Sequence, residues 1–350
     1  MAGPLHGIRI IEIAGLGPGP FAAMMLADHG AEVIRVERKG MPLDKGDPLL
    51  RSRIVVHHDL KSPEGQAAIR ELVRDADGLI EGFRPGVMER LGLGPDVLLA
   101  DNPNLIYGRM TGWGQSGFYA PRAGHDINYI AVSGALHMIG RKDEAPVVPL
   151  NLVGDFGGGG MMLAFGMVSA LLAVKSGAKG QVVDCAMTDG SALLTAMMWG
   201  FRAKGFWQDE RESNLLDGAA PFYDTYRTAD GLYMAVGAIE PQFYAAFLTG
   251  LDLAGDPLFD NQMDPSGWPA QKARIAEVFA SRNRDDWCAV FDTVDACVTP
   301  VLSMNDAPKA AHNQNRTTFI TVDGVEQPAP APRYSGTPTP TPVPPALREG

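Results

Sequence analysis

Three segments of the sequence carry side chains that could move protons to and from a substrate. His125 and Asp126 end a stretch rich in glycine and aromatic residues, and Asp155 precedes a run of four glycines. Glu240 stands before Pro241, at the start of a predicted helix. A histidine or carboxylate held beside a reacting atom acts as a general acid or base, and imidazole titrates near neutral pH. The residues themselves therefore predict an enzyme with a site built from carboxylates and a histidine.

Each of these residues also has an ordinary structural interpretation. A single histidine is more often structural than chemical, and Asp155 could cap the helix that follows it. Four glycines exceed what a cap needs, and they favour a backbone that approaches a ligand and donates N–H bonds to a developing oxyanion. Glu240 could simply stabilise a helix N-terminus. The His-Asp pair also occurs in metal-dependent phosphohydrolases, but the other histidines lack the ligand spacing, so we expect no metal site.

The segment Gly15–Pro20 lies between a predicted strand and a predicted helix. A dinucleotide-binding fold requires G-x-G-x-x-G at this place and an acidic residue about 20 positions later. Gly15, Gly17 and Glu37 match that pattern, but Pro20 occupies the third glycine position. This mismatch argues against a nicotinamide oxidoreductase. Two interpretations stay open: a tight turn, or a helix N-terminus that binds a phosphate or acyl group.

The elements that must position these residues alternate between strands and helices. Ile8–Ile13, Phe21–His29 and Ala31–Glu37 predict a strand–helix–strand unit and hence a parallel sheet. Further strands are predicted at Asp77–Glu81, Leu105–Arg109 and Gln181–Cys185, and further helices at Ser62–Arg74, Met161–Val174 and Thr188–Trp199. The predicted fold is α/β, with a Rossmann-like parallel-sheet large domain.

The pattern changes near residue 222. Thr228–Gly231 separates two runs that are typical of an antiparallel hairpin, Phe222–Arg227 and Leu232–Val236. Helices are predicted at Pro241–Leu248, Pro269–Ser281 and Arg284–Asp292, and a strand at Val298–Leu302. These elements predict a smaller α+β domain. The 8 prolines between Pro328 and Pro345 then predict an extended strap over a surface.

Composition excludes several classes of function. The 350 residues include 30 Lys and Arg against 41 Asp and Glu, a net charge of −11, which argues against nucleic-acid binding. The longest weakly polar run, Met161–Val174, is shorter than the about 20 residues of a membrane span, and no signal peptide is apparent. Cys185, Cys288 and Cys297 are widely spaced and odd in number, which argues against a disulfide framework. We therefore expect a cytoplasmic protein with no membrane partner.

Several motifs together resemble the class III CoA-transferase superfamily, with the α-methylacyl-CoA racemases as the most similar branch. They run along the whole chain and read LHGIRIIEIAGLGPGPFAAMMLADHGAEVIRVER, HHDLKSPEG, EGFRPGVMERLGLGP, YGRMTGWGQSG, AGHDINYIAVSGAL, NLVGDFGGGGM and VTPVL. Transferases of this superfamily use an aspartate nucleophile at the position that Asp155 matches. Racemases keep that aspartate and add a histidine in G-H-D, matched by His125, and a glutamate matched by Glu240. The resemblance therefore implies a racemase with His125, Asp155 and Glu240 as its catalytic residues. The enolate would also need N–H donors, and the amide of Asp155 or those of its glycine-rich neighbours are the candidates.

The resemblance also implies how the substrate binds. CoA, which is part of the substrate and not a separate cofactor, would lie across the carboxyl edge of the parallel sheet. Its contacts would come from Arg38, Leu60, Arg84, Gly124, Asp126, Asn151 and Tyr223. The chain departs from the family pattern at His58, where a small or aliphatic residue usually precedes Asp-Leu-Lys.

Members of this family are interlocked homodimers, and each site uses the large domain of one subunit and the small domain of the other. By the resemblance, residues 1–186 and 312–350 form the large CoA-binding domain, 187–224 the connecting helices, and 225–311 the small domain. The predicted partners are thus an acyl-CoA substrate and a second copy of the chain.

Three hypotheses about activity follow. The first is inversion of the α-carbon of 2-methyl-branched acyl-CoA thioesters by two-base 1,1-proton transfer through an enolate. The alternative is a class III CoA transferase that moves CoA between carboxylic acids through an anhydride on Asp155. The third is a CoA-binding protein without catalysis. The sequence leaves open whether the acyl group is a sterol side chain, a branched fatty acid or an aryl-propionyl group.

Overall fold

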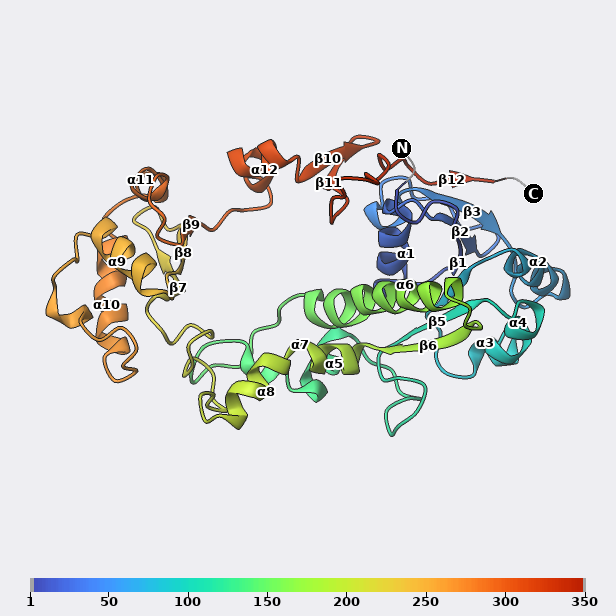
Figure 1. Ribbon diagram of the computed structural model, residues 1–350, viewed down its shortest axis with the longest axis horizontal. Helices are drawn as coiled ribbons and strands as arrows, with labels where there is room; N and C mark the ends of the chain where they lie inside the picture. The colour runs from blue at the N-terminus through green and yellow to red at the C-terminus, as the bar shows by residue number, and fades with distance from the viewer. Residues whose placement is uncertain (1–2, 349–350) are drawn as a thin grey trace. The chain divides into compact units, whose positions relative to one another are not determined.

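A computed structural model describes residues 3–348, which divide into two compact units (Figure 1). The first unit contains the described residues through Ala135, then Pro149–Ala196, and those from His312 onward. The second contains Leu136–Val148 and Met197–Ala311. The chain therefore passes from one unit to the other more than once, and the first unit is assembled from segments far apart in sequence.

A seven-stranded sheet in which every paired strand is parallel forms the centre of the first unit. Its strands are β1 (Arg9–Ile13), β2 (Glu32–Glu37), β3 (Arg53–His57), β4 (Gly78–Glu81), β5 (Ile106–Thr111), β6 (Gln181–Ala186) and β12 (Ala346–Leu347). Their order across the sheet is β12-β3-β2-β1-β4-β5-β6. The predicted α/β architecture with a parallel sheet is confirmed.

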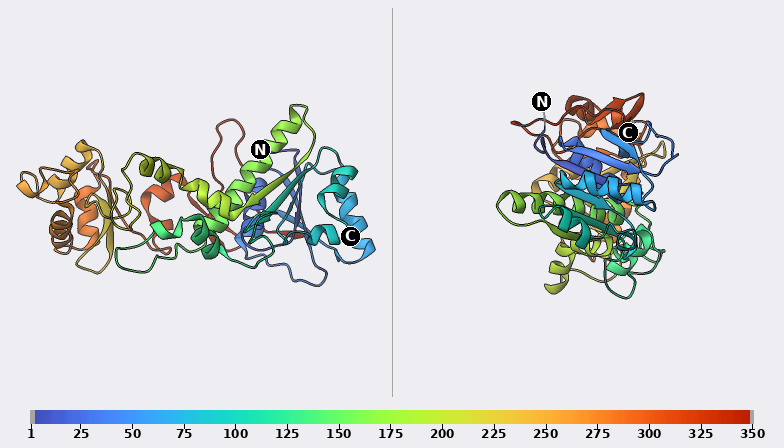
Figure 2. Two further views of the ribbon diagram at one scale, coloured as in Figure 1. Left: turned by 90° about the horizontal axis from the view of Figure 1, so that it is seen from below. Right: turned by 90° about the vertical axis from the view of Figure 1, so that its right-hand side faces the viewer.

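Helices cover both faces of this sheet (Figure 2). The helices of this unit are α1 (Pro18–Asp28), α2 (Pro63–Arg74), α3 (Val87–Arg90), α4 (Pro95–Asp101), α5 (Asp126–Ser133), the π-helix η3 (Leu152–Met161), α6 (Met162–Lys175), α7 (Met187–Leu194), α12 (Ala311–Arg316) and the short 3-10 helix η1 (Pro48–Leu50). Helices α1 and α6 pack on one face, and α2, α3 and α4 on the other.

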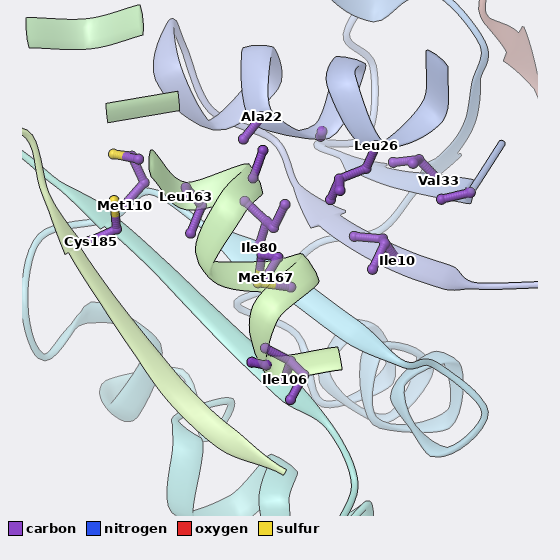
Figure 3. Close-up of a cluster of buried hydrophobic side chains, with 14 of the residues drawn as sticks. Ile10, Ala22, Leu26, Val33, Ile80, Ile106, Met110, Leu163, Met167 and Cys185 are labelled. Carbon is purple, nitrogen blue, oxygen red and sulfur yellow. The ribbon is translucent and has the colours of Figure 1, made fainter. Parts of the chain in front are cut away.

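Neighbouring side chains in a strand point to opposite faces, so each apolar strand contributes to two cores. Ile10 and Ile80 belong to the core under α1 and α6, where Leu163 and Met167 of α6 pack against the sheet (Figure 3). Ile11, one residue after Ile10, belongs to the core on the other face. Burial on both faces explains why these strands read as continuous apolar runs.

Two predicted loops are helical in the structure. Helix α1 begins at Pro18 and not at Phe21, because Gly17 takes a positive φ of 65° and Pro18 stands at the first helical position, where a proline ring is tolerated. Residues 157–160 were expected to precede the helix predicted at Met161–Val174, but they lie inside η3. The glycines read locally as a break, and packing against neighbouring helices holds them in helical form.

Helices η3 and α6 follow one another without interruption over Leu152–Lys175, a 24-residue run that is longer than predicted. By length and composition alone, this run of the described chain could cross a membrane, with a mean hydropathy of 1.7 in its most apolar window. Of that window, 44% is buried inside the protein, and Leu163 and Met167 of this run are fully buried in the core of the first unit. A helix in the core of a folded protein can be equally long and apolar, so the run is only weak support for a membrane span.

A buried charge network lies beneath the turn that joins β1 to α1. Glu12 is fully buried in β1 between Ile11 and Ile13, and it accepts hydrogen bonds from Arg35 and from Arg53 Nε at 2.8 Å. Arg53 Nη2 also donates to the carbonyl of Pro20 at 2.8 Å. Because a buried charge is tolerated only when it is paired and hydrogen-bonded, this network fixes the position of the first turn of α1.

The second unit has its own core around a three-stranded antiparallel sheet. Its elements are β7 (Tyr223–Arg227), β8 (Tyr233–Gly237), β9 (Val298–Pro300), α8 (Ala196–Ala203), α9 (Pro241–Gly250), α10 (Trp268–Phe279), α11 (Arg284–Phe291) and the 3-10 helices η2 (Leu136–Met138), η4 (Pro257–Phe259) and η5 (Ala307–Lys309). The predicted hairpin, the three helices and the last strand are confirmed within a few residues. The single helix expected at Thr188–Trp199 is instead α7 and α8, which belong mainly to different units.

The proline-rich segment returns to the first unit. It follows a hairpin of β10 (Phe319–Val322) and β11 (Val325–Pro328), and its last part adds β12 to the edge of the sheet beside β3. Arg51 anchors the segment, because its guanidinium pairs with Asp28 and also donates to the Gln327 side chain at 2.9 Å and to the Pro328 carbonyl at 2.7 Å.

Candidate functional site

A pocket of about 600 Å³ opens at the carboxyl edge of the parallel sheet. Its walls come from the segments that follow β1, β4, β5 and β6, together with the first turn of η3. Strands β1 and β4 are neighbours, and the chain winds away from them in opposite directions. Such a switch point is where open α/β sheets bind their ligands. The sequence predicted ligand binding along this edge.

His125 is the N-cap of α5 and lines the pocket. Its backbone is extended, and its amide donates to Oδ1 of Asn128 at 3.0 Å, which fixes the residue against the first turn of the helix. The residue is exposed, so the imidazole is accessible to a ligand.

Asp155 lies in the first turn of η3 and lines the same pocket. One interpretation of the sequence placed Asp155 before the helix as its cap, but Asn151 is the cap residue, and Asn151 Nδ2 donates to Oδ2 of Asp155 at 3.2 Å. Burial raises the pKa of the Asp155 carboxyl group, and the negative charge of Asp126 raises it further. The hydrogen bond from Asn151 and the nearby His125 lower it, but the net result is a pKa above the ordinary aspartate value. The carboxyl group is therefore easier to protonate than an ordinary aspartate.

Asp126 is only 5% exposed and follows His125 at the first position of α5. Its Oδ2 accepts a hydrogen bond from the backbone amide of Asp155 at 2.7 Å. The sequence pointed to that amide, or to those of residues 157–160, as the donor for an oxyanion. The Asp155 amide already has a partner, so this part of the expectation is wrong for Asp155.

Six of the seven predicted CoA contacts lie in the first unit. Arg84, Gly124 and Asn151 line the pocket with His125 and Asp155. Arg38 and Leu60 follow β2 and β3 at the same edge of the sheet, but neither is among the residues that line it. Their roles, like that of Asp126, stay predictions.

Two residues of the pocket wall were missed by the sequence analysis. Trp113 lines the pocket, and its indole Nε1 is buried without a hydrogen-bond partner among the described residues. Arg122 also lines it, and its guanidinium lies 4.3 Å from the ring centroid of Phe118 and 5.3 Å from that of Tyr119. The sequence could have indicated Arg122, because it is a single basic residue two positions before Gly124 in a segment with aromatic residues.

Glu240 and Tyr223 belong to the second unit. Glu240 is the exposed N-cap of α9, as predicted, and Pro241 follows at the first helical position. The segment before it is held by Gln262, whose Nε2 donates to the carbonyl of Ile239 at 2.8 Å. Tyr223 begins β7 and lines a separate cavity of about 730 Å³ within this unit.

The chemical groups of the first pocket suit proton transfer. An imidazole and a carboxyl group with a raised pKa share one cavity, and Arg84 and Arg122 provide positive charge at its wall. Between residues 3 and 348, no cluster of three or more His, Cys, Asp or Glu side chains is arranged to hold a metal ion.

Comparisons with known proteins give the family. The chain is 50% identical over 329 residues to the alpha-methylacyl-CoA racemase of Mus musculus, covering 94% of this chain and 85% of that protein. It is 30% identical to the human succinyl-CoA:glutarate CoA-transferase, covering 98% of this chain and 83% of the relative. A CAIB/BAIF family protein from Brucella suis has a similar crystal structure, with a TM-score of 0.81, 25% identity, and coverage of 97% and 95% of the two chains. Residues 5–349 match the sequence model of CoA-transferase family III, and the chain belongs to that family.

Proposed function

We propose that this protein is a racemase that inverts the α-carbon of 2-methyl-branched acyl-CoA thioesters. The observation that carries the proposal is that His125 and Asp155 line one pocket at the switch point of the sheet. The 50% identity to a mouse alpha-methylacyl-CoA racemase over nearly the whole chain supports the same activity.

Inversion needs one group to remove the α-proton from one face and a second group to deliver a proton to the opposite face. In one direction Asp155 takes the proton, and the electron pair of the C–H bond moves into the thioester as an enolate. Protonated His125 then gives its proton to the other face, which restores the neutral thioester. For the other epimer the two residues exchange roles. Each positioned acid or base contributes about 10²–10⁴-fold to the rate.

The raised pKa of Asp155 suits this exchange of roles. A residue that must act as acid for one epimer and as base for the other works best when both protonation states are populated. An ordinary aspartate is almost entirely ionised near neutral pH, whereas partial burial beside Asp126 favours its neutral form.

The enolate oxygen also needs a hydrogen-bond donor. Each such donor is worth about 10²–10³-fold, and the amide of Asp155 is already bonded to Asp126. The first amides of an α-helix lack partners inside the helix. Those of Asp126 and Ile127 begin α5 directly after His125 and are the donors that we assign.

The competing function is CoA transfer between carboxylic acids with Asp155 as nucleophile. It accounts for Asp155 but gives no role to His125, and the transferase relative is 30% identical against 50% for the racemase. Under this alternative, hydroxylamine would trap an acyl group on Asp155, and His125→Ala would leave trapping unchanged.

The proposed active unit is a homodimer in the cytoplasm, with CoA as part of the substrate and no separate cofactor. In each site Glu240 from the second subunit would orient His125, and Tyr223 would contact the CoA arm. The three cysteines, none of which is paired, fit a reducing compartment.

Sharing of the site can be tested by mixing inactive subunits. Dimers of His125→Ala with Glu240→Ala contain one intact site if each site draws on both subunits. A random mixture should then recover about a quarter of wild-type activity, because half of the dimers are mixed and half of their sites are intact. No recovery in a mixture shown to exchange subunits would assign His125 and Glu240 to one chain.

The central experiment follows the α-proton by NMR. Purified protein is incubated in D₂O with one epimer of a 2-methylacyl-CoA and no acceptor acid. We expect loss of the α-proton signal together with formation of the other epimer, and a severe loss of both with His125→Ala or Asp155→Ala. Protein that binds the thioester but shows no exchange would refute the racemase and leave a transferase or a non-catalytic CoA binder.

A further inference from the structure

One buried carboxylate joins the two segments that carry the proposed acid–base pair. Asp126 follows His125 directly in the chain, and its Oδ2 accepts from the backbone amide of Asp155 at 2.7 Å. Asp155 is 29 residues further along the sequence and lies on a different helix. The bond therefore ties the start of α5 to the first turn of η3 at the point where both line the pocket.

The neighbourhood of this carboxylate has no spare room. A Cβ atom at Gly154 would lie 2.6 Å from Oδ2 of Asp126 and 3.2 Å from Cγ2 of Ile130. Only glycine can therefore precede Asp155 while the bond is kept. A side chain at position 154 would push Asp126 away from the amide that it holds.

The arrangement is costly for the fold. Asp126 is 5% exposed, and its other oxygen, Oδ1, is buried without a hydrogen-bond partner among the described residues. A buried polar atom left without a hydrogen bond destabilises a protein. Departures of this kind concentrate at functional sites, where geometry matters more than stability.

We infer that Asp126 is a positioning residue, whose side chain holds the backbone of Asp155 at a fixed place relative to His125 and so sets the separation of the two proton-transfer groups. This inference rests on the proposed racemase function. A two-base reaction is sensitive to that separation, because both groups must reach the same carbon atom from opposite faces. A misplacement of about 1 Å can cost about 10²-fold in rate.

The charge of Asp126 gives the inference a second consequence. It raises the pKa of Asp155, while His125 and the hydrogen bond from Asn151 lower it. Tyr129 on α5 also interacts with the charge of Asp155, and Arg84 and Arg122 line the same pocket. Removing only the charge of Asp126 should thus move the titration of Asp155 to lower pH.

Two variants separate the bond from the charge. Asp126→Asn keeps an oxygen that can accept from the Asp155 amide but removes the charge, and Asp126→Ala removes both. Asn128→Ala is the comparison variant for the charge, since Asn128 lies in the same turn of α5, is uncharged, and its Oδ1 accepts from the backbone amide of His125. Deuterium exchange is measured for each epimer separately across a range of pH, and circular dichroism and thioester binding check the fold.

We expect Asp126→Ala to lower kcat by about 10²-fold with little change in KM. Asp126→Asn should keep most of the maximal rate, and for the epimer deprotonated by Asp155 the rise of rate with pH should begin at lower pH. Asn128→Ala should show no such shift. If Asp126→Ala does not fold, the pH profile of Asp126→Asn decides the question.

Wild-type kcat in Asp126→Ala together with an unshifted profile in Asp126→Asn would overturn the positioning role. A wild-type protein without exchange would instead refute the racemase itself, so the two failures are distinguishable. Replacement of Gly154 by Ala should reproduce the kcat loss of Asp126→Ala, because it displaces the same carboxylate.

Discussion

Two glycine-rich segments flank the candidate site, and they use glycine in opposite ways. At the β1–α1 turn, a Cβ on Gly19 would meet nothing within 4 Å, and one on Gly17 would meet only the Asp155 carboxylate, at 3.4 Å. In η3, a Cβ on Gly158 would lie 2.5 Å from the amide nitrogen of Ser191, and one on Gly160 would lie 2.6 Å from Phe21. The first segment is open to the pocket, and the second is enclosed by helices.

The difference separates two roles that look alike in sequence. Open glycines leave space next to Asp155 for a ligand, whereas enclosed glycines let α1 and α7 approach η3 closely enough to hold Asp155 in place. Substitutions in the enclosed segment should therefore damage the fold, and those in the open segment should act mainly on the site.

The largest effect is expected for Gly190→Ala. A Cβ at Gly190, on α7, would lie 1.8 Å from the carbonyl oxygen of Gly158, so the two helices must separate. We expect a loss of stability of about 3 kcal/mol or more, seen as a lower thermal unfolding temperature. Gly200→Ala is the control, since nothing lies within 4 Å of its Cβ, and equal behaviour of the two variants would contradict close packing here.

Gly17→Ala should have the next largest effect. Gly17 has φ of 65° and ψ of −113°, a conformation open almost only to glycine, and the change should cost about 1–3 kcal/mol. The methyl group would also face Asp155, so exchange at the α-carbon should fall by more than the loss of folded protein explains. Unfolding and exchange are measured on the same sample, and full specific activity would argue against an open site at this turn.

Gly19→Ala should increase the stability of the protein and weaken substrate binding. Gly19 lies in the first turn of α1 without a positive φ, so alanine should stabilise the protein by about 0.4–1 kcal/mol. Because Gly19 lines the pocket, KM for the thioester should rise while stability increases. A loss of stability would show that this segment is enclosed as well.

The smallest change in stability is expected for Asp155→Asn. The pKa of Asp155 is raised in the folded protein, so ionisation disfavours folding, and stability falls as pH rises through that pKa. The amide cannot ionise, so the variant should be slightly more stable than wild type near neutral pH, and the difference should shrink below the ordinary aspartate pKa. Unfolding temperatures at several pH values test the sign, and a variant less stable at neutral pH would contradict it.

Local patterns in the sequence predicted most strands and helices of both units within a few residues. Ser62 caps α2 as expected and accepts from the amide of Gly65. The misses occur where distant contacts decide the local structure. The helical form of residues 157–160 depends on α1 and α7. Glu12 is tolerated among the buried isoleucines of β1 because Arg35 and Arg53 reach it from β2 and β3.

The site was predictable in part. The resemblance placed His125 and Asp155 together, and both line one pocket. It did not indicate that Asp126 bonds the amide of Asp155, because no local pattern links residues 29 positions apart. Arg122 was overlooked because it lies outside the quoted motifs, although its aromatic neighbours fix its position at the pocket wall.

The strand β12 has a consequence for how the protein is made. It pairs with β3, and Arg51 reaches Gln327, which is 276 residues further along the chain. During synthesis the pairing of β3 with β12 and the bonds of Arg51 to Gln327 and Pro328 must wait until the entire second unit has left the ribosome. A nascent chain thus carries an unpaired strand edge for most of its translation, and unpaired edges promote association between chains. The interval between β3 and β12 is therefore the period in which a chaperone would protect this protein most.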